Sequence, residues 1–287
     1  MFQTPRFRPA QNGAINYRSN TPIGPEQLQK IAPSVFADRA HDSRSEKYQY
    51  IPTIDIVRAL TREGFQPFSV QQGGSRDEDK RGFTKHLIKF RHEGEQQVLN
   101  GMHHEICLLN SHDGTSSYQL FSGIFRLVCL NGMVAQEAEI ANVRVRHSGD
   151  IVSQVVEGSH AVLENTRLLG GRIEEMQGII LSPPEKLAFA RAALVAKYGE
   201  NPEEAPIRAG QLLEIQRYAD EGDDLWTTLN VVQEHLVKGG DRYTTYDAQG
   251  RVKARRQTRE IRSVDGNLAT NRALWALAAE MSKLKAA

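Results

Sequence analysis

A histidine and an aspartate stand side by side in residues 110–116, Asn-Ser-His-Asp-Gly-Thr-Ser, and an arginine follows ten residues later. Imidazole and carboxylate groups are ligands for zinc or manganese and can exchange protons with a substrate. Arg126 lies in an otherwise apolar stretch, where its guanidinium group needs a carboxylate, a carbonyl or a phosphate as partner. His112, Asp113 and Arg126 are therefore one candidate centre for a metal- or ligand-dependent enzyme.

The spacing around this pair favours a turn over a catalytic centre. His103 and His104 are neighbours and would point to opposite faces of a strand. The sequence has no His-Glu-x-x-His, Cys-x-x-Cys, phosphate-binding or Gly-x-Ser-x-Gly motif. Asn110, Ser111 and Asp113 are residue types whose side chains bond the backbone of a turn, in which Gly114 takes a positive φ. We therefore predict no catalytic residue, metal ligand or cofactor, and keep the enzyme as an alternative.

Basic residues concentrate in two segments. Residues 251–262 hold six cations with Glu260 as the one acidic residue, and residues 80–91 hold five cations. Cations at alternate strand positions can follow a nucleic-acid backbone, and aromatic neighbours such as Tyr243 and Tyr246 can stack on bases. A solvated face or a contact with a protein partner is the alternative for either segment. The residues that we predict to bind nucleic acid are Lys80, Arg81, Lys85, Lys89, Arg91, Arg126, Arg144, Arg146, Arg255, Arg256 and Arg259.

Composition is that of a globular protein of 287 residues, 39% apolar and 25% charged. No apolar run approaches the roughly 18 residues of a membrane span, and the N-terminus lacks the apolar core of a secretion signal. Two cysteines make no disulfide framework, so we expect a cytoplasmic protein without a membrane partner. Charge is segregated: residues 151–237 carry 7 basic and 14 acidic side chains, and residues 238–287 carry 11 and 5. The basic end of the chain is the part that can approach phosphates.

Three regions are expected to position these residues. Residues 1–50, interrupted by prolines, are predicted as an extended N-terminal arm. Residues 51–180 are predicted as an α+β core with an antiparallel sheet and a long helix. Residues 181–287 are predicted as a helical C-terminal region that contains a basic loop over 239–265.

The fold class that these patterns predict is α+β: an N-terminal helix, an antiparallel meander of four to five strands, and a helical C-terminal half. The first helix begins near Thr53, which can cap it, and ends at Gly64. Asp113-Gly114 predicts a hairpin that sets Cys107 opposite Leu120 or Phe121. Strands are expected over 65–72, 83–91, 105–110, 118–130 and 143–147. Later helices are expected over 152–176, 182–198, 208–218, 224–237 and 271–285.

Several irregular motifs, in the same order, resemble the plasmid- and prophage-encoded family known as domain of unknown function 932. The resemblance covers most of the chain, and the family has no settled biochemical role to transfer. Its motifs here include Tyr50-Ile51-Pro52-Thr53, Glu63-Gly64-Phe65, Phe83-Thr84-Lys85-His86, residues 110–116, residues 125–132, residues 146–150, Leu225-Trp226, residues 230–234, Lys238-Gly239-Gly240 and residues 271–275.

A second resemblance is architectural. A helix, a Gly-Phe pair, a three-stranded antiparallel meander and a long helix are similar to the annealing core of Rad-fifty-two-type single-strand annealing proteins. In that core, basic residues on the sheet and hairpin hold single-stranded DNA in the outer groove of a ring. The resemblance implies a mobile-element protein that binds single-stranded DNA and promotes strand annealing in recombination without enzymatic turnover, as a homo-oligomer such as a ring. The alternatives are the enzyme above and a protein-interaction factor, such as an antagonist of host defence.

Overall fold

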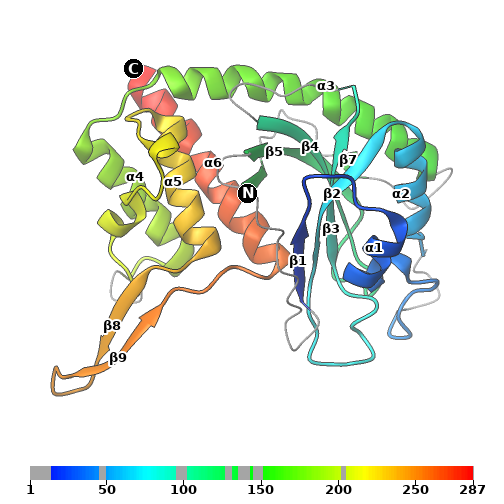
Figure 1. The fold of residues 1–287 in the computed structure, drawn as a ribbon, viewed down its shortest axis with the longest axis horizontal. Coiled ribbons are helices and arrows are strands. Elements are labelled where there is room, and N and C mark those ends of the chain that lie inside the picture. The colour runs from blue at the N-terminus through cyan, green and yellow to red at the C-terminus, as the bar shows by residue number, and fades with distance from the viewer. Residues whose placement is uncertain are drawn as a thin grey trace. The chain divides into compact units, whose positions relative to one another are not determined.

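The computed structural model of the chain describes residues 14–44, 50–94, 102–126, 131–134, 143–144, 151–201 and 205–286 (Figure 1). The chain divides into two compact units. The first comprises Met1–Leu168 together with Arg262–Asp265, and the second comprises Leu169–Ile261 together with Gly266–Ala287.

An antiparallel sheet organises the first unit. Its strands lie in the order β1-β2-β3-β4-β5-β6, and β7 pairs with β5. The predicted meander is confirmed as β2 to β5, and Cys107 lies opposite Phe121 as the hairpin predicted. The strand bounds are β1 Ile15–Arg18, β2 Phe65–Gln72, β3 His86–His92, β4 Met102–Asn110, β5 Gln119–Arg126, β6 Asn131–Val134 and β7 Val143–Arg144.

The N-terminal segment is more ordered than its prolines predicted. β1 pairs with β2, and a helix α1 (Pro25–Ile31) and a 3-10 turn η1 (Pro33–Phe36) follow. Prolines begin α1 and η1. The first N–H of a helix has no partner within the helix, so proline, which lacks this group, is tolerated there. The expectation of an extended arm over all of residues 1–50 is therefore wrong for residues 15–36.

One face of the sheet is apolar and packs on helices. Leu28 of α1, Ile56 and Leu60 of α2 (Thr53–Arg62), and Val155 of α3 (Ile151–Gly178) join one buried cluster with alternate strand residues. The strand residues in this cluster are Val70, Ile88, Phe90, Ile106, Leu108 and Leu120.

The opposite face of the sheet carries charges. Because side chains alternate along a strand, Lys89 and Arg91 of β3 share this face with Glu105 and Cys107 of β4. All four are buried. Burial raises the pKa of the Cys107 thiol to about 12 and makes it an inert core residue. Cys129 lies outside the described residues.

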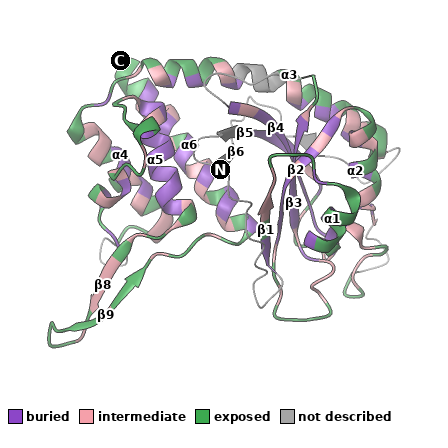
Figure 2. Cartoon of the chain, in the orientation of Figure 1, coloured by how far each residue is buried: buried purple, intermediate pink, exposed green. Residues whose placement is uncertain are grey.

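Helices dominate the second unit. The last part of α3 is followed by α4 (Pro183–Tyr198), α5 (Leu225–Lys238) and the part of α6 (Val264–Ala286) beyond Asp265. Nearly every residue of α5 is buried, which makes it the central helix of the unit (Figure 2). The predicted capping box at Ser182 and Glu185 is confirmed. The helix predicted over 208–218 is wrong, because this segment forms only the short 3-10 turns η2 (Ala209–Leu213) and η3 (Tyr218–Asp220).

A β-hairpin replaces the loop predicted over 239–265. β8 (Arg242–Tyr246) and β9 (Val252–Gln257) pair with each other as a two-stranded sheet. Figures 1 and 2 show a two-stranded ribbon that extends away from the end of α5 and is largely exposed or half-exposed. Residues 239–259, which include both strands, are termed the arm below. The chain as a whole is α+β, as predicted.

Candidate nucleic-acid interface

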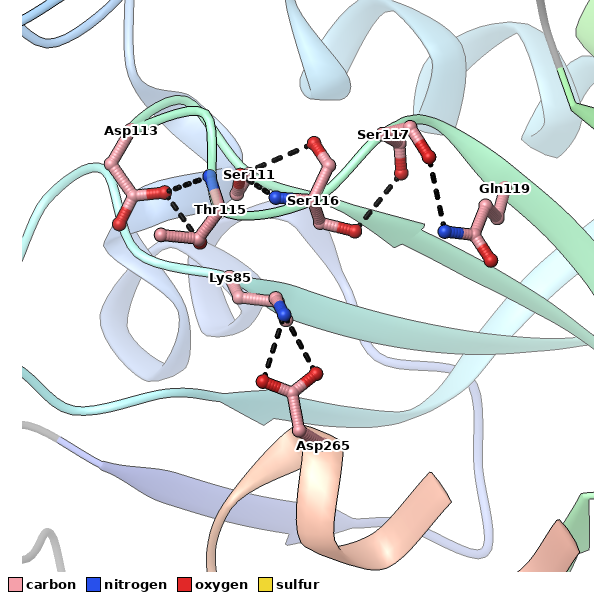
Figure 3. Close-up of polar contacts among 8 residues, drawn as sticks. All are labelled: Lys85, Ser111, Asp113, Thr115, Ser116, Ser117, Gln119 and Asp265. Carbon is pink, nitrogen blue, oxygen red and sulfur yellow. Dashed lines mark hydrogen bonds and ion pairs between the residues drawn. The ribbon is translucent and has the colours of Figure 1, made fainter. Parts of the chain in front are cut away.

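The cations at the β2–β3 connection have acidic partners within the first unit. Lys85 Nζ donates to both carboxylate oxygens of Asp265, at 2.6 and 2.8 Å (Figure 3). Arg81 pairs with Glu78 at 2.9 Å, and Lys80 Nζ lies 3.8 Å from Asp77. The last two pairs are exposed and therefore weak, so Lys80 and Arg81 stay accessible to a ligand.

Lys89 and Arg91 lie inside the protein. Arg91 donates from Nε and Nη2 to Glu105 Oε1 at 3.1 and 3.0 Å, and Lys89 Nζ lies 3.9 Å from Glu105 Oε2. The side chain of Glu105 is 0% exposed, and those of Lys89 and Arg91 are 5% and 9% exposed. Burial lowers the pKa of Lys89 and that of Arg91, and the carboxylate of Glu105 opposes both shifts. One carboxylate thus holds two buried cations, and neither cation is presented to a phosphate in this structure.

The other predicted arginines of the first unit are widely separated. Arg144 pairs with Gln119 at one end of β5, and Arg126 forms the other end, opposite Met102. Seven steps of a strand span about 24 Å. The side chains of Arg126 and Arg144, and the whole of Arg146, lie outside what the structure describes.

The candidate centre of His112, Asp113 and Arg126 does not assemble. His112 is buried, whereas Asp113 occupies an exposed loop. Asp113 Oδ1 accepts from the backbone N–H and the hydroxyl of Thr115, at 3.0 and 2.6 Å, and Gly114 has φ +76° (Figure 3). Arg126 lies at the far end of β5, so the alternative that brings these three residues together is wrong. Among the described residues, no group of three or more histidine, cysteine or acidic side chains could hold a metal ion.

His112 instead belongs to a buried chain of hydrogen bonds. Thr53 Oγ1 lies 3.2 Å from His112 Nε2 and 3.0 Å from His86 Nε2, and Asn110 Nδ2 donates to it at 3.0 Å. The cap of α2 is Pro52, so Thr53 binds these side chains and does not cap the helix as predicted. The turn motif is thereby tied to the start of α2 and to β3.

Each donor in this chain can be assigned. His86 Nδ1 faces the Thr84 carbonyl at 3.2 Å and Ser34 Oγ at 3.0 Å, and the hydroxyl of Ser34 donates to Gln72 Oε1. A carbonyl can only accept, so Nδ1 of His86 carries the proton and Nε2 accepts from the Thr53 hydroxyl. Thr53 Oγ1 must then accept from His112 Nε2.

Both histidines are buried and neutral. Burial lowers the pKa of His86 to about 3 and that of His112 to about 4. His112 Nδ1 is left buried, without a hydrogen-bond partner among the described residues. Sequence reasoning missed Ser34, Thr53 and His86 as members of this network, because their contacts join positions 33 to 59 residues apart. The network is a structural support for the turn.

The arm presents its cations differently. Arg242, Lys253, Arg255, Arg256 and Arg259 are exposed, and none has an ion-pair partner among the described residues. Arg251 at the tip is the exception, because it pairs with Asp247 at 3.0 Å. Hydrogen bonds from the backbone and side chain of Arg251 lower the pKa of Asp247.

Strand pairing distributes these groups over both faces of the arm. Arg255 lies opposite Thr244, and Arg256 lies opposite Tyr243. Neighbouring residues of a strand point to opposite sides, so each face carries an arginine. Tyr246 pairs with Val252 after a register shift, and these side chains are 61% and 59% exposed. An open recess is lined by Arg242, Tyr243, Thr244, Arg255, Arg256 and Gln257.

The base of the arm is held firmly. His235 Nε2 lies 2.8 Å from the Glu214 carbonyl, and its Nδ1 lies 2.5 Å from Asp241 Oδ1. The Glu214 carbonyl can only accept, so Nε2 of His235 donates to it. Asp241 also accepts from the hydroxyl of Thr258 across the hairpin. Gly239 has φ +65°, and a Cβ there would lie 2.7 Å from backbone atoms of residues 258 and 259.

The sequence signal for this interface was the basic composition of residues 251–262, and the structure adds Arg242 from the facing strand.

None of the described helices is both long enough and apolar enough to cross a membrane.

Comparison with known proteins gives relatives over nearly the whole chain. The model of the family described as "Domain of unknown function (DUF932)" matches residues 40–275. Two Escherichia coli (strain K12) proteins, UPF0380 protein YafZ and UPF0380 protein YfjQ, are each 45% identical to the chain over 267 residues. Each match covers 93% of this chain and 94% of the relative. No solved structure matches the chain.

Proposed function

The chain belongs to the DUF932 family, and we propose that it binds single-stranded DNA through the arm. The observation that supports the proposal most strongly is the exposure of the cations on the arm. Five exposed cations of the arm have no ion-pair partner among the described residues. A phosphate backbone is the partner that such a set can neutralise with release of counterions.

The aromatic residues of the arm support a single strand over a duplex. Tyr246 is largely exposed and Tyr243 is half-buried beside Arg256. An aromatic ring can stack on a base only where that base is not already stacked within a duplex. Alternate residues of a strand also advance by about 6.8 Å, a step that suits an extended single-stranded backbone.

Strand annealing without turnover is the activity that this mode of binding would serve. Cations that neutralise phosphates reduce the repulsion between complementary strands. The proposal includes a homo-oligomer, in which several arms hold one strand, and a cytoplasmic protein that acts for a mobile element. The cations of β3 have no part in it, because Lys89 and Arg91 are buried against Glu105.

The test is fluorescence anisotropy with a labelled thymine oligonucleotide over a series of salt concentrations. The Arg255→Glu/Arg256→Glu variant should bind more weakly, and each lost phosphate contact should lower the salt slope by about 0.7. Tyr246→Ala should weaken binding at all salt concentrations, because stacking contributes about 1–3 kcal/mol per base.

The matched control is Arg58→Glu, since Arg58 lies on α2 and its side chain is 61% exposed. Absence of binding at low salt, or an equal loss in the control, would reject the proposal. Mass photometry with and without the oligonucleotide tests the homo-oligomer separately.

A further inference from the structure

Helix α4 has apolar residues on two sides, of which one is partly exposed. Phe189, Ala190 and Ala193 of this helix are buried in the second unit. Leu187, Leu194 and Val195 lie on a different side of the helix and are half-buried or exposed. A helix that is apolar on two sides is expected to have something packed on each.

The outer side of α4 forms one wall of a groove. Leu187, Leu194 and Val195 line it from the helix, and Ala205, Pro206 and Ile207 line it from the segment before η2. Its volume is about 650 Å³, within the roughly 300–1,000 Å³ of typical ligand sites. All of these residues belong to the second unit.

Two arginines border this groove. Arg191 from α4 and Arg208 from the opposite wall are both exposed. Neither has an ion pair among the described residues, whereas Arg172 and Arg217 of the same unit each pair with an acidic side chain. Guanidinium groups beside an apolar surface favour a ligand that carries carboxylates next to aliphatic groups.

The lining narrows the class of ligand. Its described residues include no aromatic, hydroxyl or amide side chain that could read a base or a sugar. Val195 is 45% exposed, so a free aliphatic chain in the groove would keep one side in water. A peptide can bury its apolar anchor side chains there and keep its backbone in solvent.

We infer that this groove binds an acidic peptide segment of a partner protein, with aliphatic side chains against α4 and carboxylates on Arg191 and Arg208. The net negative charge of residues 151–237 would otherwise repel such a segment, so these two arginines provide the local attraction. The groove is therefore a protein-docking site that is separate from the arm.

The probe is a short fluorescein-labelled peptide in which a run of aspartates precedes two leucines, measured by anisotropy with the full chain. Arg191→Glu and Arg208→Glu should each weaken binding about tenfold, the size expected for a lost charged hydrogen bond. Val195→Asp should also weaken it, and the exposure of Val195 keeps this variant folded, which circular dichroism verifies.

The matched controls separate the groove from the arm. Arg255→Glu/Arg256→Glu should leave peptide binding unchanged, and Arg191→Glu should leave oligonucleotide binding unchanged. A second peptide with lysines in place of the aspartates should not bind. The inference is overturned if the acidic peptide fails to bind, if the lysine peptide binds equally, or if octanoate competes for the groove as well as the peptide does.

Discussion

The sheet and the arm both carry lysines and arginines on paired strands, yet they place them in opposite environments. On β3, Lys89 and Arg91 are buried and share the carboxylate of Glu105. On β9, Arg255 and Arg256 are exposed and have no ion-pair partner among the described residues. The cations of β3 are neutralised by a carboxylate inside the protein, whereas those of β9 remain available to a partner.

This difference shows why a stripe of cations alone does not define a nucleic-acid site. Alternation places Lys89 and Arg91 on one face of β3, and Arg255 and Arg256 on opposite faces of β9. Whether such cations are covered depends on the rest of the fold: β3 lies inside a sheet, whereas β8 and β9 form a two-stranded sheet. An isolated two-stranded ribbon has little apolar surface to bury, so its side chains remain in solvent.

The largest expected effect comes from removing the charge of Glu105. Glu105→Gln keeps the shape of the side chain but removes the carboxylate charge that pairs with the buried Lys89 and Arg91. The free energy of unfolding, measured by urea denaturation, should fall by about 3–5 kcal/mol. The matched control is Asp265→Asn at the exposed partner of Lys85, where the loss should stay below about 1 kcal/mol. If Glu105→Gln lost no more stability than Asp265→Asn, the charges of the sheet would not be structural.

A smaller effect is expected from pH, and the buried His86 and His112 of the first unit contribute to it. Burial lowers the folded-state pKa of His86 to about 3 and that of His112 to about 4, from an ordinary value of 6.5. The unfolded chain therefore takes up protons below pH 6.5 that the folded chain does not. The contribution of the two histidines to the free energy of unfolding is therefore complete above pH 6.5. It is lost as the pH falls toward their folded-state pKa values.

Urea titrations between pH 6.5 and 5 measure this contribution. Each histidine should lower the free energy of unfolding by up to about 1.4 kcal/mol per pH unit. His112→Gln keeps a donor toward Thr53 and should flatten the pH dependence. The arm, residues 239–259, contains no histidine, so oligonucleotide binding should change little over the same range. An unchanged slope in His112→Gln would assign the pH dependence to other groups.

Local patterns predicted the elements well. The capping box at Ser182, the apolar periodicity of α2 and α3, and the Asp113-Gly114 turn each depend on residues close together in the chain. The register of Cys107 opposite Phe121 followed from that turn. These features could be predicted because short-range hydrogen bonds and side-chain spacing determine them.

Long-range pairing was the part that the sequence did not reveal. β1 pairs with a strand about fifty residues later. It was not predicted because the prolines around it indicated an extended arm. The partners of Lys85 and Arg91 lie 180 and 14 residues away, so the sequence did not distinguish them from free cations. Residues 239–265 were predicted as a basic loop, whereas Gly239 and Gly240 precede the hairpin of β8 and β9.

The smallest expected effect on stability belongs to the arm, and it is the sharpest test of the contrast with the sheet. Arg255 and Arg256 are exposed and make no ion pair among the described residues. Arg255→Glu/Arg256→Glu should therefore change the free energy of unfolding by no more than about 0.5 kcal/mol, while Glu105→Gln loses several times more. Both variants are compared by urea denaturation at one salt concentration and pH. If the arm variant lost as much stability as the sheet variant, its cations would be part of the fold, and weakened DNA binding could not be attributed to lost phosphate contacts.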